Sequence, residues 1–282
     1  MTPAGLQLRD AVVVVTGGGS GIGAAMARRF AAEGAQVIVN DLDGDAAKAV
    51  AAEFGGRAVA ADAADPCDVR RLVDLAWEEH AGLDLFCANA GVSPAADPAL
   101  PDAAWEQSWR VNVMAHVHAA RALLPRWLAD GQGRLLVTAS AAGLLTMLGR
   151  APYAVTKHAA VAFAEWLRAT YEHRGVVVQA LCPQGVRTPM LLGGRTGESR
   201  SADGARSAAR TLLDDTAISP EQVADAVVEA MADDRFLVLP HPEVATYYAR
   251  RAADPDRWLR GMNKLQRTAV EPAAGPAGTD LL

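Results

Sequence analysis

Tyr153 and Lys157 stand four residues apart in the segment PYAVTK. Side chains four apart in a helix project from the same face, so this phenol and this ammonium can act on one small volume. A phenol has a reference pKa of about 10, and an ammonium together with a cationic ring nearby would favour its phenolate form. The spacing therefore predicts a pair able to exchange a proton with a bound hydroxyl group near neutral pH.

Two more polar side chains stand where they can join this pair. Ser140 ends the apolar run RLLVTAS, 13 residues before Tyr153, which suits a hydroxyl that points into the same cleft. Taken alone, such a serine is more typical of a turn. Asn112 interrupts the apolar helical segment WRVNVMAH, where a lone asparagine usually indicates hydrogen-bonded structure. His116 and His118 differ by two positions and face different sides of a helix, which favours packing or subunit contacts over a metal site.

A glycine-rich turn, TGGGSGIG, follows the first apolar run and precedes an Ala-rich helical segment. Glycines at such a turn permit a tight bend, close approach of a phosphate and close seating of helix on strand. The free N–H groups and positive end of the helix suit a pyrophosphate. The residues predicted to form this site are Gly17, Gly19, Ser20, Gly21, Ile22 and Gly23.

Asp41 ends the second apolar run, 18 positions after Gly23. This is close to the spacing at which an acidic side chain meets the adenosine ribose hydroxyls of a dinucleotide. A carboxylate there would repel the 2′-phosphate of NADP, and the GGGS turn and Asn40 to Leu42 contain no arginine to neutralise it. Asp41 and Leu42 therefore favour NAD. The alternative is that Asp41 only caps the next helix, a task that Asp43 can also perform.

Later strand ends carry small and polar residues that fit the same nucleotide. Asp62 and Ala63 follow the third run, where either a contact with an adenine edge or an ordinary helix cap is consistent with the sequence. The segment CANAG places Asn89, Ala90 and Gly91 after the fourth run, which fits backbone packing beside the adenosine half.

Strand and helix patterns alternate along the chain. Short apolar, β-branched runs predict seven strands, at 11–15, 36–40, 57–61, 83–87, 134–138, 176–181 and 235–239. Helical spacing is seen between them at 21–33, 43–54, 66–80, 106–128 and 153–173. This alternation predicts an α/β fold, a doubly wound Rossmann-type parallel sheet with helices on both faces and ligands at the carboxyl ends of its strands.

The length of 282 residues suits one large domain with an added tail. We expect a single Rossmann-type domain over 1–240, with a substrate lid at about 190–219 that is rich in Gly, Ser, Ala and Arg. Residues 241–282 are expected to form a helical extension and a flexible tail. In the extension Tyr247, Tyr248, Trp258, Leu259, Met262 and Leu265 recur at roughly helical spacing.

Composition excludes several other classes of protein. A formal charge of −6 gives no basic footprint for nucleic acid. Cys67, Cys87 and Cys182 are widely spaced, which argues against disulfides and against zinc. We expect no bound metal, no membrane span and a cytoplasmic location, because neither a signal-peptide pattern nor an apolar run of membrane length is found.

The chain resembles the short-chain dehydrogenase/reductase family over about residues 8 to 240. The resemblance rests on Thr16-Gly17-xxx-Gly21-x-Gly23, NAG at 89–91, Asn112, Ser140, and Tyr153-xxx-Lys157. It implies that Ser140 holds the substrate oxygen and Tyr153 exchanges its proton. Lys157 would tune the tyrosine and, with it, bind the nicotinamide ribose, while Asn112 supports a water-linked proton path. Members commonly form tetramers, which implies a homotetramer here.

One segment departs from the family pattern. After the sixth strand the family usually has Pro-Gly, whereas this chain reads CPQGVRTPM, with Gln184 in place of that glycine. The resemblance implies that this loop contacts the nicotinamide carboxamide through Pro183, Gly185, Val186 and Thr188. Gln184 either tolerates the same backbone or adds a side chain to the wall of the substrate site, and both remain open.

The sequence as a whole predicts an NAD-dependent enzyme that interconverts a secondary alcohol and a ketone. The segment GLLTMLG, within 141–148, suggests an apolar wall for an apolar substrate, together with Ser93, Pro94 and the residues from Met190 onward. Arg195, Arg200, Arg206 and Arg210 in the lid either meet an acidic group or are simply solvated. The rival hypotheses are an NADPH-dependent ketone reductase and a non-catalytic NAD-sensing protein.

Overall fold

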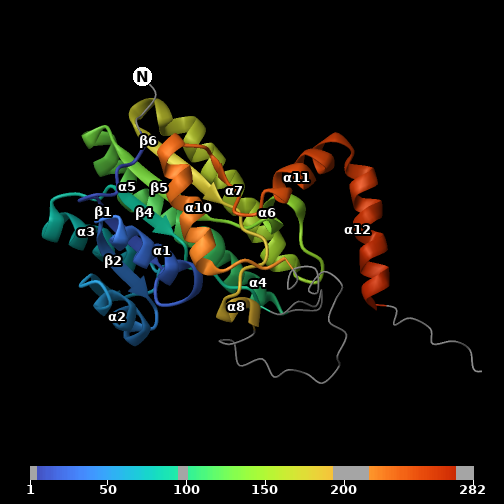
Figure 1. Ribbon diagram of the computed structural model, residues 1–282, viewed down its shortest axis with the longest axis horizontal. Helices are drawn as coiled ribbons and strands as arrows, with labels where there is room; N and C mark the ends of the chain where they lie inside the picture. The colour runs from blue at the N-terminus through green and yellow to red at the C-terminus, as the bar shows by residue number, and fades with distance from the viewer. Residues whose placement is uncertain (1–4, 95–100, 193–215, 271–282) are drawn as a thin grey trace, which may run out of the picture.

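Seven parallel strands form one sheet in the order β3-β2-β1-β4-β5-β6-β7 (Figure 1). The computed structural model describes residues 5–94, 101–192 and 216–270. The strands are β1 (Val12–Thr16), β2 (Gln36–Asp41), β3 (Arg57–Ala60), β4 (Leu85–Ala88), β5 (Gly133–Thr138), β6 (Val176–Leu181) and β7 (Leu237–Val238). The predicted doubly wound, Rossmann-type α/β fold is confirmed.

Helices cover both faces of this sheet because its strands are apolar on both sides. In β1, Val12 and Val14 join one core cluster, whereas Val13 and Val15 join the other, as the twofold period of a strand requires. One face packs against α1 (Gly21–Ala32), α2 (Gly44–Ala52) and α10 (Pro220–Asp233). The other packs against α3 (Pro66–His80), α5 (Ala115–Asp130) and α7 (Ala151–Tyr171).

Several helices begin at side chains that satisfy their first N–H groups. Asp43 accepts hydrogen bonds from the amides of Asp45 and Ala46 at the start of α2. Asp65 does the same for α3, and Ser219 forms a capping box with Gln222 at the start of α10. These caps fix where the chain turns from the sheet edge into each covering helix.

The segment 106–128 does not form the single helix that its pattern predicts. It begins in α4 (Asp102–Trp109), passes through a five-residue π-helical turn, η1 (Arg110–Met114), and continues as α5. The hydrophobic pattern does not reveal this turn, because a π turn accommodates one extra residue and leaves the apolar stripe of the helix nearly continuous. The turn lies at Asn112, one of the predicted site residues.

The remaining short elements are α6 (Ala142–Leu145), η2 (Glu172–Arg174) and α8 (Pro189–Leu192). After β7 the chain forms α11 (Glu243–Ala253) and α12 (Pro255–Val270). Helix α12, red in Figure 1, lies away from the sheet and its covering helices. Most of the predicted lid, 193–215 with its four arginines, and the tail 271–282 lie outside the described residues.

A buried ion pair joins the centre of the sheet to its edge. Both nitrogens of the Arg134 fork on β5 bond the carboxylate of Asp234, which follows α10, and both side chains are buried. Removing one member of a buried pair is far more costly than removing an exposed one, because the remaining charge stays out of water.

Asp234→Asn keeps the size of the side chain but removes its charge. We expect it to lower the free energy of unfolding by about 3 kcal/mol, measured by urea denaturation. The matched control is Asp233→Asn, whose carboxylate forms a solvent-exposed pair with Arg235 and should change stability little. Equal effects of the two variants would contradict a structural role for the buried pair.

Candidate active site

Hydrogen bonds from Thr16 and Asn89 join the carboxyl ends of β1, β4 and β5. The Thr16 hydroxyl donates to the carbonyl of Cys87 at 3.2 Å and accepts from the amides of Asn89 at 2.9 Å and Ala90 at 3.1 Å. The side-chain nitrogen of Asn89 donates to the Thr16 carbonyl at 3.0 Å, and its side-chain oxygen accepts from the Thr138 hydroxyl at 3.1 Å. The NAG segment is therefore part of the frame that aligns three strand ends.

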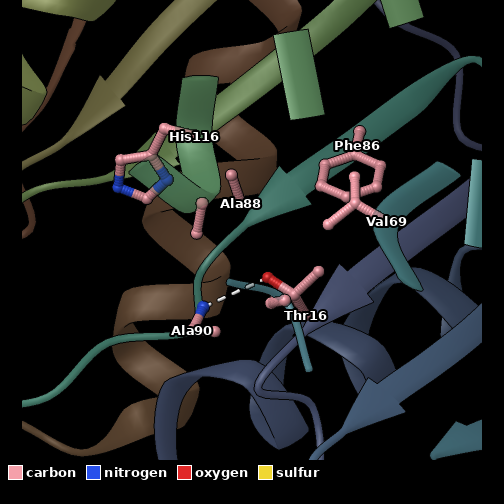
Figure 2. A pocket seen from close by; sticks show the side chains of 8 residues that line it. Thr16, Val69, Phe86, Ala88, Ala90 and His116 are labelled. Carbon is pink, nitrogen blue, oxygen red and sulfur yellow. Dashed lines mark hydrogen bonds between the residues drawn. The ribbon is translucent and has the colours of Figure 1, made fainter. Parts of the chain in front are cut away.

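Figure 2 shows a small pocket at these strand ends, in which the bond from Ala90 to Thr16 is drawn. Its lining is apolar except for the Thr16 hydroxyl and the ring of His116, and comprises Thr16, Ala63, Val69, Phe86, Ala88, Ala90, Ala115 and His116. Burial lowers the pKa of His116 to about 3, so this ring is neutral. Tyr153 is not among the residues that line this pocket.

Lys157 is buried, with 3% of its surface exposed. Its Nζ donates to the carbonyl of Thr138 at 2.7 Å and lies 5.6 Å from the centre of the Tyr153 ring. Burial lowers the pKa of Lys157 to about 8. A Cβ on Gly91 would lie 3.3 Å from the Asn112 side-chain oxygen and 3.5 Å from this nitrogen, so the NAG segment packs beside both side chains.

Tyr153 and Ser140 lie together at the end of β5. Their side chains are hydrogen-bonded, and the Ser140 hydroxyl also accepts from the amide of Ala142 at 3.1 Å and lies 3.4 Å from the carbonyl of Pro183. Burial raises the pKa of Tyr153, while the bond with Ser140 opposes that rise. In the protein without cofactor, desolvation outweighs the influences that lower this pKa. The effect of a cationic ring stays a prediction.

Asn112 is held in the π-helical turn by three hydrogen bonds. Its amide oxygen accepts from the amide of Val92 at 2.9 Å, and its nitrogen donates to the Val92 carbonyl at 2.9 Å and to the Thr156 hydroxyl at 3.1 Å. Thr156 precedes Lys157 on α7, so Asn112 ties the segment after β4 to the helix that carries the tyrosine and lysine. Extra turns of this kind are frequent at functional sites.

The glycine-rich turn opens α1 with a backbone that requires glycine at two positions. Gly17 has φ +62°, and a Cβ on Gly23 would lie 2.1 Å from the Gly17 carbonyl oxygen, so neither position accepts another residue without movement. Within the described residues no side-chain hydrogen bond caps the start of α1, and its first turn holds no acidic residue. The positive end of the helix thus meets no protein carboxylate in its first turn, which fits the binding of a pyrophosphate by the segment from Gly19 to Ile22.

Asp41 lies beside this turn. One carboxylate oxygen accepts from the Gly19 amide at 2.9 Å and the other from the Asp43 amide at 3.0 Å. A carboxylate has about four acceptor positions, so two bonds leave capacity for ribose hydroxyls. Asp43 caps α2, which removes the capping alternative for Asp41. Leu42, 77% exposed, offers an apolar surface next to it.

Asp62 is already engaged by the protein. Its carboxylate accepts from the Ala64 amide and pairs with Arg110, in both cases at 2.9 Å, while Asp65 serves as the cap of α3. Asp62 is therefore a turn residue with an ion pair, and the helix-cap alternative for it is wrong. Ala63 lies beside it and lines the pocket of Figure 2.

The loop after β6 runs from the reacting end to the phosphate turn. The Pro183 carbonyl accepts from the Ala141 amide at 2.8 Å, next to Ser140, and a Cβ on Gly21 would lie 3.1 Å from the methyl of Thr188. Between them, Val186 forms a single parallel bridge with Ile218. Gly185 and Gln184 are bonded to His241, which follows β7.

Sequence reasoning did not single out four residues that support this site. Thr138, Thr156, Arg150 and His241 act through hydrogen bonds to backbone or to other side chains. A strand-end position was the only available signal for Thr138. His241 had none, because its partners stand 56 and 57 residues away in the chain.

The short chain dehydrogenase family model matches residues 11–198. A 1-deoxy-11-beta-hydroxypentalenate dehydrogenase from Streptomyces exfoliatus is 41% identical, over 82% of this chain and 83% of its own length. A short-chain dehydrogenase/reductase from Burkholderia phymatum, solved in complex with NAD, is similar with a TM-score of 0.78, 27% identity and coverage of 95% and 99% of the two chains. A 3-ketoacyl-(acyl-carrier-protein) reductase from Brucella melitensis, solved with NADH, has a TM-score of 0.71, 26% identity and coverage of 82% and 96%.

The chain therefore belongs to the short-chain dehydrogenase/reductase family of oxidoreductases. The family assignment made from the motifs is confirmed. Among the described residues no helix has the length and apolar character needed to cross a membrane. Within the same residues no cluster of three or more potential metal ligands is found.

The depressed pKa of Lys157 predicts a pH-dependent stability. The folded value of about 8 lies below the ordinary 10.5, so folding disfavours the charged form, and the cost is fully present below pH 8 and is lost as the pH rises toward 10.5. Lys157→Met removes this cost. The free energy of unfolding of Lys157→Met minus that of the native protein should fall by about 2 kcal/mol between pH 7 and pH 10, measured by urea denaturation.

Lys48→Met, which alters an exposed lysine of α2, is the control for general effects of high pH. A stability difference between Lys157→Met and the native protein that stays constant across the same range would contradict the buried ammonium.

Proposed function

We propose that this protein is an NAD-dependent dehydrogenase/reductase that interconverts a secondary alcohol and a ketone on an apolar substrate. The observation that carries the proposal is the meeting of a phenol, a hydroxyl and a buried amino group at the ends of β4 and β5, with an uncapped, glycine-lined helix start at the neighbouring strand. Family membership and two similar structures solved with NAD or NADH support it.

The cofactor-binding residues fit a dinucleotide laid across the strand ends. The turn from Gly17 to Gly23 would hold the pyrophosphate, Asp41 the adenosine ribose, and Leu42 with Ala63 the adenine. Asn89, Ala90 and Gly91 would support the middle of the molecule. Pro183, Gly185, Val186 and Thr188 would hold its nicotinamide end. When bound there, NAD supplies the acceptor of a hydride from the substrate carbon.

The protein's own part is to hold the substrate oxygen and move its proton. Ser140 donates a hydrogen bond to that oxygen, and Tyr153 takes the proton at its Oη during oxidation or returns it during reduction. The Lys157 ammonium lies close enough to favour the phenolate, and with Tyr153 it would bond the nicotinamide ribose. Asn112 fixes the π-helical turn beside them and supports a water-linked path for the proton.

NAD is proposed over NADP on the charge at Asp41. Its carboxylate lies beside the glycine turn, at 2.9 Å from the Gly19 amide, where a 2′-phosphate would meet a like charge. An NADPH-dependent reductase of the same fold is the second candidate, and it requires a cation where this chain has Asn40 to Leu42.

An apolar alcohol or ketone is proposed as the substrate. Leu144 and Leu145 pack into the core, whereas Met147 and Leu148 remain partly exposed, so the apolar wall is smaller than the sequence suggests. Gln184 adds one polar group to this wall. The name of the Streptomyces relative, a dehydrogenase of a hydroxypentalenate, supports a hydroxylated carbon compound as the substrate.

A homotetramer in the cytoplasm completes the proposal. Val155 and Trp166 are exposed and lie 11 residues apart on α7, a spacing that places both on one face, and Trp109 is exposed on neighbouring α4. Apolar residues gathered on adjacent helices favour a subunit contact.

The non-catalytic alternative, an NAD sensor, predicts a protein that binds NAD without turnover.

Tyr153→Phe tests the catalytic proposal, because it removes the phenolic oxygen and keeps the ring. With NAD and a panel of cyclic secondary alcohols, we expect kcat to fall at least about 100-fold, followed by the absorbance of reduced nicotinamide. The matched control is Tyr171→Phe at the end of the same helix, which should retain native kcat. Equal turnover by native protein and Tyr153→Phe would defeat the assignment.

Asp41→Asn tests the cofactor preference while keeping an acceptor for the Gly19 amide. We expect the ratio of kcat/KM for NAD to that for NADP to fall about tenfold or more, since a repulsive charge is removed. Asp43→Asn, which preserves the cap of α2, should leave the ratio unchanged. An unaltered ratio in Asp41→Asn would show that this carboxylate does not read the ribose.

A further inference from the structure

His241 is a buried histidine that the proposed chemistry does not use. It follows β7 and is 2% exposed. Its Nδ1 accepts from the backbone amide of Gln184 at 3.2 Å, and its Nε2 lies 3.1 Å from the carbonyl oxygen of Gly185. A single imidazole thus bonds both ends of one dipeptide in the loop after β6.

These partners define the state of the ring. A nitrogen that faces a carbonyl must carry a proton, whereas a nitrogen that faces an N–H must offer its lone pair. His241 is therefore neutral with its proton on Nε2. Burial, the strongest influence, lowers its pKa, in agreement with this state, against an opposing effect of Glu243 on α11 and of backbone groups at Gly185 and Thr216.

The dipeptide that His241 holds lies between the reacting end and the phosphate turn. Pro183, immediately before it, is bonded to the Ala141 amide beside Ser140, and Thr188, shortly after it, lies against Gly21. The Gly185 carbonyl also accepts from the Ile218 amide at 3.1 Å, so both of its acceptor positions are used within the protein. This loop has little freedom while the imidazole is present.

The side chain of Gln184 explains why the bonds with His241 are needed. Its side-chain oxygen is buried and has no hydrogen-bond partner among the described residues. An unsatisfied buried carbonyl is unfavourable because it has lost its bonds to water, and this favours any movement of the loop that would expose it. The two bonds from His241 oppose that movement, and they leave the oxygen available to a donor brought by a ligand.

We infer that His241 is a positioning residue, which holds the Gln184–Gly185 backbone in the conformation that receives the nicotinamide end of the cofactor. The inference rests on the proposed function, because it places NAD along this loop. In this role His241 acts on the cofactor site through its bonds with Gln184 and Gly185.

A comparison of two ligands that share their adenosine half distinguishes a positioning role of His241 from a general effect on stability. NAD and ADP-ribose have the same adenosine and pyrophosphate, but ADP-ribose lacks the nicotinamide. In His241→Leu we expect the Kd for NAD to rise about tenfold while the Kd for ADP-ribose changes less than about twofold, both measured by calorimetry. In turnover, KM for NAD should rise more than kcat falls.

Two conservative variants separate the two bonds. Asn places an acceptor where Nδ1 stands and can restore the bond from Gln184, while Gln places a donor near Nε2 and can restore the bond to Gly185. We expect His241→Asn and His241→Gln each to recover part of the NAD affinity lost in His241→Leu. They also carry the test if the Leu variant fails to fold. His173→Leu, at an exposed position in η2, is the matched control and should bind both ligands as the native protein does.

Equal weakening of NAD and ADP-ribose, or no weakening of either across the His241 variants, would overturn the positioning role while leaving the proposed function intact. Native protein that binds neither ligand would overturn both. NAD binding and turnover by native protein, with a loss confined to NAD in His241→Leu, would support both.

Discussion

The site depends on a lysine kept out of water. The ammonium of Lys157 is buried and donates a hydrogen bond to the carbonyl that ends β5. This bond joins β5, which Ser140 follows, to α7, which carries Tyr153. Burial of a charge is unfavourable unless its donors are satisfied, which constrains every neighbour of this nitrogen. Gly91 leaves room for it, and Thr138 supplies an acceptor to it from the strand end while bonding Asn89.

The same constraint links the two halves of the site. Asn89 joins β1 to β4 and to Thr138, and Asn112 joins the segment after β4 to Thr156, the neighbour of Lys157. The glycine turn after β1 and the polar residues after β5 are therefore held in one hydrogen-bonded frame. The proposed phosphate site and the proposed proton-transfer site depend on the same few strand ends, as is usual in doubly wound folds, where ligands lie at the carboxyl ends of strands.

Strand positions and the shared helical face of Tyr153 and Lys157 follow from local patterns, because continuous apolar runs and fourfold spacing are properties of neighbouring residues. The place of Ser140 beside them was predicted from the family resemblance. The ion pair of Asp62 and the raised pKa of the Tyr153 phenol could not be predicted from the sequence. The first depends on Arg110 and the second on desolvation, and only the packed structure defines these. His241 could not be found either. Its contact with Gln184 arises from the pairing of β6 with β7, and no short-range spacing encodes it.

The π-helical turn at Asn112 carries a consequence for how this stretch of chain can vary. A π turn accommodates one extra residue in an otherwise regular helix, so the apolar residues of α4 and those of α5 stay on the same stripe. Inserting or deleting a residue in the regular part of α5 would instead shift every later side chain by about 100° around the helix axis, and the buried face with Leu123 and Trp127 would turn away from the sheet. A deletion within the π turn would keep α5 in phase, but it would remove the turn that holds Asn112.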